Sequence, residues 1–216
     1  MKFLYRTIAL FLCAVALFSQ AAHALDLSAE SAVLIEADSG DIVFEKNAKQ
    51  RMSMASTTKI MTLLVALENS NPEDVVTVSK TAVSEEGSSA YLKPGARITM
   101  RDLCYGLMLN SGNDAAVAIA EHISETTDDF AEFMNDTAKR TGILNTHFVN
   151  PNGLHDDNHF TTASDLARLT RYALQNDTFR EIVSSGMYTS TMLMPDGTIQ
   201  NVEYINHNRL LKELDG

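Results

Sequence analysis

The spacing of apolar residues along the chain changes several times, which indicates a mixture of strands and helices. Residues 31–37 and 41–45 have strand patterns, and Asp38-Ser39-Gly40 between them has the composition of a tight turn. These features predict an N-terminal β-hairpin. Residues 74–78 predict a short strand, and residues 187–193 and 198–205 predict a second hairpin across Pro195-Asp196-Gly197.

Longer apolar runs predict helices between these strands. They cover residue 56 to about 68, 100–109, 115–123, 127 to about 142, 162 to about 175, and 177–185. Strands and helices are interleaved without strict βαβ alternation. The pattern therefore predicts an α/β (α+β) fold with an antiparallel sheet and a cluster of helices.

Capping residues define the starts of three of these helices. Thr99 with Asp102, and Thr162 with Asp165, have the spacing of capping boxes. Thr127 is predicted to cap the fourth helix. That helix should bury one apolar face, which the helical period assigns to Phe130, Phe133, Met134, Thr137 and Ala138.

A short polar elbow interrupts two of the predicted apolar helices. It consists of Asn110-Ser111-Gly112-Asn113-Asp114. Polar groups that are buried need hydrogen-bonding partners, and lining a functional site is one way to provide them. The other long irregular segments are predicted at residues 80–95 and 146–160.

Residues 1–24 have the pattern of a signal peptide. Lys2 and Arg6 are positive, residues 8–18 are apolar, and Ala22-His23-Ala24 fits a cleavage site. The apolar stretch is short for a membrane span, although a retained N-terminal anchor is the alternative. We expect an exported protein whose mature domain covers residues 25–216.

The two cysteines and the net charge narrow the chemistry. Cys13 would leave with the signal peptide, so Cys104 would be the single thiol, and its apolar surroundings predict a buried hydrophobic role. The formal charge of −11 argues against nucleic-acid binding and against adhesion to anionic lipid. His155 and His159 have a spacing that zinc sites use, but no third ligand follows at motif spacing, so loop packing or hydrogen bonding is favoured. No metal and no cofactor are expected.

Ser56 and Lys59 are the first candidates for catalysis. They are three residues apart, so on a helix they share a face. A serine needs a base to become a nucleophile at neutral pH, and a lysine can be that base when burial lowers its pKa. The spacing alone is weak evidence, and by itself it favours a serine that only caps a helix, with Lys59 on a solvated face. Ser111-Gly112-Asn113 could likewise be a turn between helices.

The two motifs together, with their flanks, resemble a known family. Ser56-Thr57-Thr58-Lys59 and Ser111-Gly112-Asn113 correspond to S-x-x-K and S-G-N, and the matching flanks are residues 32–45, 54–67, 107–116, 148–155 and 161–167. The sequence resembles the serine-type D-alanyl-D-alanine carboxypeptidases, the low-molecular-weight penicillin-binding proteins of peptidase family S11. That family shares its active-site plan with the class A β-lactamases.

The resemblance implies a β-lactamase/transpeptidase-like fold and acyl transfer to serine. Ser56 would attack the carbonyl between two D-alanines at the end of a peptidoglycan stem peptide, and Lys59 would accept its proton. Ser111 would relay a proton to the leaving amine, and Asn113 would bind the substrate's amide backbone. The backbone N–H of Ser56 would help to stabilise the oxyanion. β-Lactams would acylate Ser56, and the enzyme would act in the periplasm or on the outer face of the cell membrane.

The third motif of the family, K-T-G, does not occur in this sequence. The resemblance therefore implies a catalytic domain truncated before K-T-G, without the C-terminal part of the sheet and without the C-terminal membrane anchor of many members. We expect these 216 residues to be inactive by themselves. Three other functions remain open: a D,D-endopeptidase, a β-lactamase and a non-catalytic wall-binding protein. The E-x-x-L-N pattern of class A β-lactamases does not occur between Asn113 and Gly216.

Overall fold

The computed structural model describes residues 27–213. Within this range, residues 31–213 form one compact unit, and residues 27–30 belong to a separate N-terminal unit and are irregular. The predicted signal peptide, with Cys13, lies outside the described residues. In the part of the chain that is described, no helix has the length and apolar character needed to cross a membrane.

The predicted N-terminal hairpin is confirmed. Strands β1 (Ala32–Ile35) and β2 (Ile42–Lys46) pair antiparallel. Gly40 closes the turn by donating its N–H to the carbonyl of Glu36 at 2.9 Å, and its φ of +80° is a conformation that glycine adopts without strain. The hairpin packs against helix α7 (Ala163–Ala173), where Arg171 donates from Nε to the carbonyl of Ala37 at 2.7 Å.

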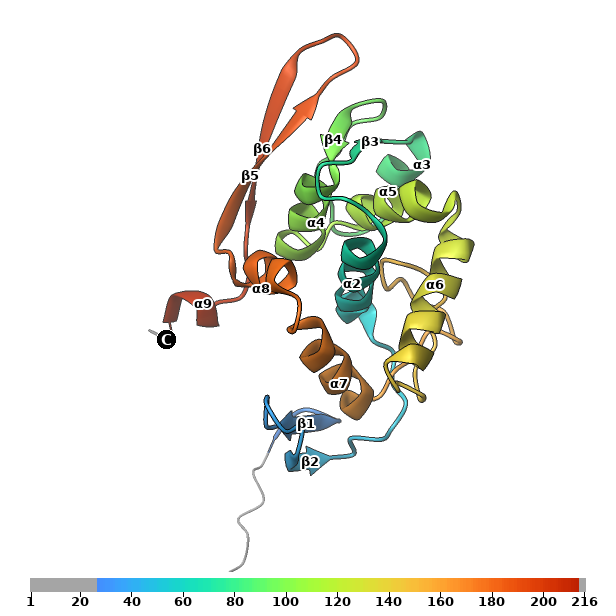
Figure 1. The fold of residues 1–216 in the computed structure, drawn as a ribbon, viewed down its shortest axis with the longest axis vertical. Coiled ribbons are helices and arrows are strands. Elements are labelled where there is room, and N and C mark those ends of the chain that lie inside the picture. The colour runs from blue at the N-terminus through green and yellow to red at the C-terminus, as the bar shows by residue number, and fades with distance from the viewer. Residues whose placement is uncertain (1–26, 214–216) are drawn as a thin grey trace, which may run out of the picture. The chain divides into compact units, whose positions relative to one another are not determined.

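A second sheet has four antiparallel strands in the order β3-β4-β5-β6. Its strands are β3 (Val75–Thr77), β4 (Arg97–Thr99), β5 (Met187–Leu193) and β6 (Ile199–Ile205). The last two form the long C-terminal hairpin in red in Figure 1, which confirms the hairpin predicted at 187–205. β4 joins β5 through a single pair, Arg97 with Leu193.

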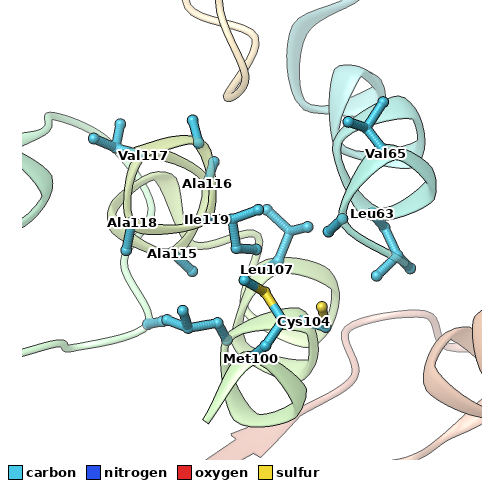
Figure 2. Packing of buried hydrophobic residues seen from close by; sticks show 14 of the residues in the cluster. Leu63, Val65, Met100, Cys104, Leu107, Ala115, Ala116, Val117, Ala118 and Ile119 are labelled. Carbon is cyan, nitrogen blue, oxygen red and sulfur yellow. The ribbon is translucent and has the colours of Figure 1, made fainter. Parts of the chain in front are cut away.

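The core lies among three helices, α2 (Lys59–Asn69), α4 (Met100–Leu109) and α5 (Asn113–Ser124). Figure 2 shows Leu63 and Val65 of α2, Cys104 and Leu107 of α4, and Ile119 of α5 within this cluster. Each of these side chains is at most 1% exposed. Burial raises the pKa of the Cys104 thiol to about 12, so the predicted role of a small buried hydrophobe is confirmed.

The remaining helices are α3 (Lys80–Ser84), α6 (Thr127–Arg140), α7, α8 (Asp177–Ser184) and α9 (Leu210–Glu213). Four of them pack around this core, whereas the short α9 lies apart from it near the C-terminal end of the chain (Figure 1). The capping predictions at Thr99 and Thr162 are confirmed, since their side chains accept from the N–H groups of Asp102 and Asp165 at 3.1 and 3.0 Å.

Two predictions for α6 are wrong. Thr126, not Thr127, caps the helix, by accepting from the N–H of Asp129 at 3.1 Å. Phe133 does not lie on the buried face with Phe130 and Met134, because it is 44% exposed. The buried face of the helix is therefore rotated relative to the prediction, and it includes Ala131 and Asn135 in place of Phe133.

Two short elements occur where the sequence predicts no helix or strand. They are helix α3, which is capped by Ser79, and strand β4. Both lie within residues 80–99, a stretch without a clear hydrophobic period. Neighbouring elements stabilise them, since α3 packs against α5 and β4 pairs with β3.

Candidate active site

Ser56 and Lys59 stand at the start of α2, with different exposure. A 3₁₀ turn, η1 (Ala55–Thr58), leads into the helix, and Lys59 Nζ lies 3.2 Å from Ser56 Oγ. Ser56 is exposed, whereas Lys59 is only 2% exposed. The hydroxyl is therefore open to solvent while the amine that contacts it is buried beneath it.

The other two contacts of Lys59 Nζ define its orientation. It donates to Asn113 Oδ1 at 2.7 Å and to the backbone carbonyl of Asn152 at 2.7 Å. A neutral amine has two N–H donors and one lone pair. Since the two oxygens take both N–H groups, the lone pair of a neutral Lys59 would be directed at Ser56 Oγ. The arrangement is that of a base held against a hydroxyl.

Burial moves the pKa of Lys59 toward neutral pH, where the amine can act as a base. It lowers the pKa of the ammonium to about 8, while the carboxylate of Asp114 acts in the opposite direction. At pH 7 about a tenth of the side chain is then neutral, compared with about 0.03% for an ordinary lysine of pKa near 10.5. Asp114 itself is 2% exposed and accepts from Ser89 Oγ at 2.6 Å and from the N–H of Ala90 at 2.7 Å.

Asn113 is the first residue of α5 and is fixed from two directions. Its Nδ2 donates to the carbonyl of Glu86 at 2.6 Å, and its backbone N–H donates to the carbonyl of Ser88 at 2.7 Å. A side-chain amide held through its nitrogen presents its oxygen in a defined direction. That oxygen accepts from Lys59, so the two sequence motifs meet in space.

Ser111 lies on the elbow between α4 and α5, two residues before Asn113. It is half-buried and has a φ of +54°, a left-handed conformation that is uncommon for serine and is often found at functional sites. Among the hydrogen bonds of residues 27–213, none joins Ser111 to Ser56 or Lys59. Its role as a proton relay stays a prediction. The next residue must be small, because a Cβ at Gly112 would lie 2.8 Å from the Cβ of Ala90.

The loop at residues 146–160 is attached to the first turns of α2. Thr62 Oγ1 donates to the carbonyl of Pro151 at 2.6 Å, next to the bond between Lys59 and Asn152. His159 is 2% exposed and its Nε2 lies 2.7 Å from Thr58 Oγ1. These bonds hold the loop along the side of α2 that carries Lys59.

The hydrogen bonds of His159 assign its tautomer. Its Nδ1 accepts from the N–H of Val149 at 3.0 Å, so Nε2 carries the proton and donates to Thr58. Burial lowers the pKa of His159 to about 4, which keeps the ring neutral at pH 7. The predicted role in loop packing and hydrogen bonding is confirmed for His159, whereas His155 is exposed. Among residues 27–213, no three His, Cys, Asp or Glu side chains are grouped so that they could hold a metal ion.

Two members of this constellation are not identifiable as site residues from the sequence. Asn152 contributes a backbone carbonyl, which every residue has, so no residue type signals it. Glu85 accepts from Asn152 Nδ2 at 2.8 Å, from a segment predicted only as loop. The resemblance of residues 148–155 to the family is the one available signal, and it marks the loop without assigning a role.

Gly153 is predicted to be indispensable for this arrangement. Its φ is +91°, and a Cβ would overlap the carbonyl oxygen of Ala55, directly before Ser56. Gly153→Ala should destabilise the fold by about 3 kcal/mol, since the left-handed conformation costs roughly 1–2 kcal/mol and overpacking roughly 1–3 kcal/mol. Denaturant unfolding followed by circular dichroism measures the change.

Gly142→Ala is the matched control for Gly153→Ala. Gly142 has a similar φ of +75°, but a Cβ there would have no heavy atom within 4 Å. This variant should cost only the conformational part, about 1–2 kcal/mol. Equal losses in the two variants would contradict the proposed close approach between Gly153 and Ala55.

Comparison with known proteins places the sequence in a defined group. The model of the family described as D-alanyl-D-alanine carboxypeptidase, peptidase S11, matches residues 18–215. The D-alanyl-D-alanine carboxypeptidase DacF of Bacillus subtilis is 36% identical over 203 residues, covering 92% of this chain and 50% of that protein. DacC of Escherichia coli is 34% identical over 203 residues, covering 89% of this chain and 49% of that protein. The chain thus spans about half the length of these relatives.

Solved structures agree with the sequence comparison. The Streptomyces K15 DD-transpeptidase superposes with a TM-score of 0.83 at 33% identity, covering 88% of this chain and 78% of that one. The carboxypeptidase DacD from Francisella tularensis gives a TM-score of 0.80 at 33% identity, covering 89% of this chain and 58% of that one. The expected β-lactamase/transpeptidase-like fold is therefore confirmed.

Proposed function

Since the chain belongs to the D-alanyl-D-alanine carboxypeptidase family, peptidase S11, we propose that the whole protein is a serine carboxypeptidase. It removes the terminal D-alanine from peptidoglycan stem peptides that end in D-Ala-D-Ala. β-Lactams inhibit it by acylating the same serine. The proposal extends to the whole protein the activity by which relatives about twice the length of this chain are named.

One observation supports the proposal above the others. Lys59 Nζ is buried, lies 3.2 Å from the exposed Ser56 Oγ, and uses its other contacts on two neutral oxygens. A buried lysine without a carboxylate on its nitrogen is poised to lose a proton. A serine that only capped a helix would not need this environment at Lys59.

The proposed reaction proceeds in two steps. Ser56 Oγ attacks the carbonyl carbon between the two D-alanines, its proton passes to Lys59, and the peptide C–N bond breaks as the terminal amine takes up a proton through Ser111. Water then attacks the ester on Ser56 and releases the shortened peptide. The backbone N–H of Ser56 stabilises the oxyanion, and Asn113 binds the substrate's amide backbone.

The proposed location follows from the substrate. Stem peptides lie outside the cytoplasmic membrane, so the enzyme must be exported, and residues 1–24 are proposed as the signal peptide that directs it there. The catalytic domain would begin at residue 25. No nucleic acid, metal or cofactor takes part in the proposed chemistry.

The experiment incubates the whole gene product, made with its export signal, with a fluorescent penicillin and, separately, with a peptide ending in L-Lys-D-Ala-D-Ala. The expected results are one covalent adduct, mapped to Ser56 by peptide mass spectrometry, and release of one D-alanine per peptide. Added glycine as an amine acceptor separates hydrolysis from transfer, and crosslinked muropeptides separate carboxypeptidase from endopeptidase. Rapid turnover of nitrocefin without a stable adduct would instead identify a β-lactamase.

A further inference from the structure

Two adjacent acidic residues hold the two amides that surround Lys59. The Glu85 side chain accepts from Asn152 Nδ2 at 2.8 Å, and the Glu86 backbone carbonyl accepts from Asn113 Nδ2 at 2.6 Å. Asn152 and Asn113 are the residues whose oxygens take the N–H groups of Lys59. The segment that contains Glu85 and Glu86 therefore holds both of the asparagines that accept hydrogen bonds from Lys59.

From this arrangement we propose that Glu85 is a positioning residue for Lys59, acting through Asn152. The inference rests on the proposed function of Lys59 as the base. An oxygen of the Glu85 side chain accepts from Asn152 Nδ2 at 2.8 Å and so fixes the nitrogen end of the amide. Asn152 Oδ1 accepts from the N–H of Leu154 at 3.0 Å, so both ends of the amide are fixed. With its side chain fixed, Asn152 holds its backbone carbonyl toward Lys59 Nζ.

The segment that carries Glu85 is itself anchored on both sides. It follows directly after α3, and the N–H of Glu85 donates to the carbonyl of Ala82 at 3.3 Å. On the other side, the carbonyl of Ser88 accepts from the backbone N–H of Asn113. Gly87 allows this segment to lie close to the Asn113 side chain, because a Cβ there would be 2.7 Å from Asn113 Nδ2. Because the segment is held on both sides, Glu85 can hold the side chain of Asn152 in a defined orientation.

The hydrogen bond, rather than the negative charge, is what the proposal requires. Glu85→Gln keeps an acceptor oxygen at the same length and removes the charge. Glu85→Ala removes both, and Glu85→Met keeps the length without a strong acceptor. Glu85→Gln should therefore preserve the orientation of Asn152, whereas Glu85→Ala and Glu85→Met should lose it.

The test measures acylation of the whole gene product by a fluorescent penicillin over a range of concentrations, which gives the acylation rate constant and the affinity of the non-covalent complex as two separate quantities. Glu85→Ala and Glu85→Met should lower the rate constant about tenfold and change the affinity less than twofold. Glu85→Gln should stay within about threefold of the wild type. A loss in affinity alone, or an equal loss in Glu85→Gln, would overturn the proposal. If Glu85→Ala does not fold, the result for Glu85→Met tests the proposal in its place.

A double-mutant cycle tests the path through Asn152. Asn152→Ala removes the amide that reaches Glu85 but keeps the backbone carbonyl that Lys59 uses. In that background Glu85→Ala should have no further effect, whereas multiplying effects would overturn the proposed path. A wild-type protein that is not acylated at all would contradict the proposed function. Normal wild-type acylation with a fully active Glu85→Ala would contradict only this inference.

Discussion

Replacing Ser56 by alanine is expected to abolish covalent labelling by penicillin and release of D-alanine. The substitution removes the only atom on which the proposed acyl-enzyme can form, and removing the nucleophile of a serine hydrolase lowers turnover on the order of 10⁶-fold. Ser56 is exposed and its hydroxyl accepts from Lys59, so its loss should leave the core intact. Gel fluorescence, intact-mass spectrometry and a D-alanine assay measure these consequences.

Ser53→Ala is the matched control for this variant. Ser53 is also exposed and lies three residues before Ser56, outside η1 and α2. It should label at the wild-type rate and at the same peptide. An adduct that persists in Ser56→Ala would place the nucleophile elsewhere and would remove the basis for the proposed function. Loss of labelling in both variants would point to a disturbed loop rather than to a lost nucleophile.

The second large effect is expected at Lys59. Lys59→Arg keeps a positive charge but cannot act as a base at neutral pH, since a guanidinium stays protonated. General-base catalysis contributes roughly 10²–10⁴-fold, so acylation of Ser56 should fall by about that factor. Circular dichroism and thermal melting check that the larger side chain still allows folding. An acylation rate above about a tenth of the wild-type rate would contradict the proposed role.

The pH dependence of the wild type tests the same residue without substitution. Burial lowers the pKa of Lys59 to about 8, and the neutral amine is the form that accepts a proton. Acylation should therefore rise with pH through about 8 and level off above that value, and it should fall about tenfold per pH unit well below it. Stopped-flow measurements with a fluorescent penicillin from about pH 6 to about pH 10 give the profile. A flat profile across the lower half of that range would contradict Lys59 as the base.

Local sequence rules account for features that depend on neighbouring residues. Turn residues place the two hairpins, and threonine–aspartate pairs place the starts of α4 and α7. The choice between Thr126 and Thr127 is beyond such rules, because both can cap a helix. The structure decides it: Thr126 has an extended backbone and its side chain accepts from the N–H of Asp129, so Thr127 is already the first residue of the helix.

The sequence identifies the side chains that could react, whereas the tertiary contacts set the surroundings of those side chains. The S-x-x-K spacing predicted that Lys59 would reach Ser56, because residues three apart share a helix face. Lys59 also contacts Asn113, which is 54 residues away in the sequence, and the carbonyl of Asn152, which is 93 residues away. A backbone carbonyl has no residue-type signature, and burial of an ammonium depends on packing from several elements. The lowered pKa of Lys59 therefore depends on the packing of α2 against α5 and the 146–160 loop. The hydrogen bond from Asn152 to Glu85 depends on the contact between that loop and the segment after α3.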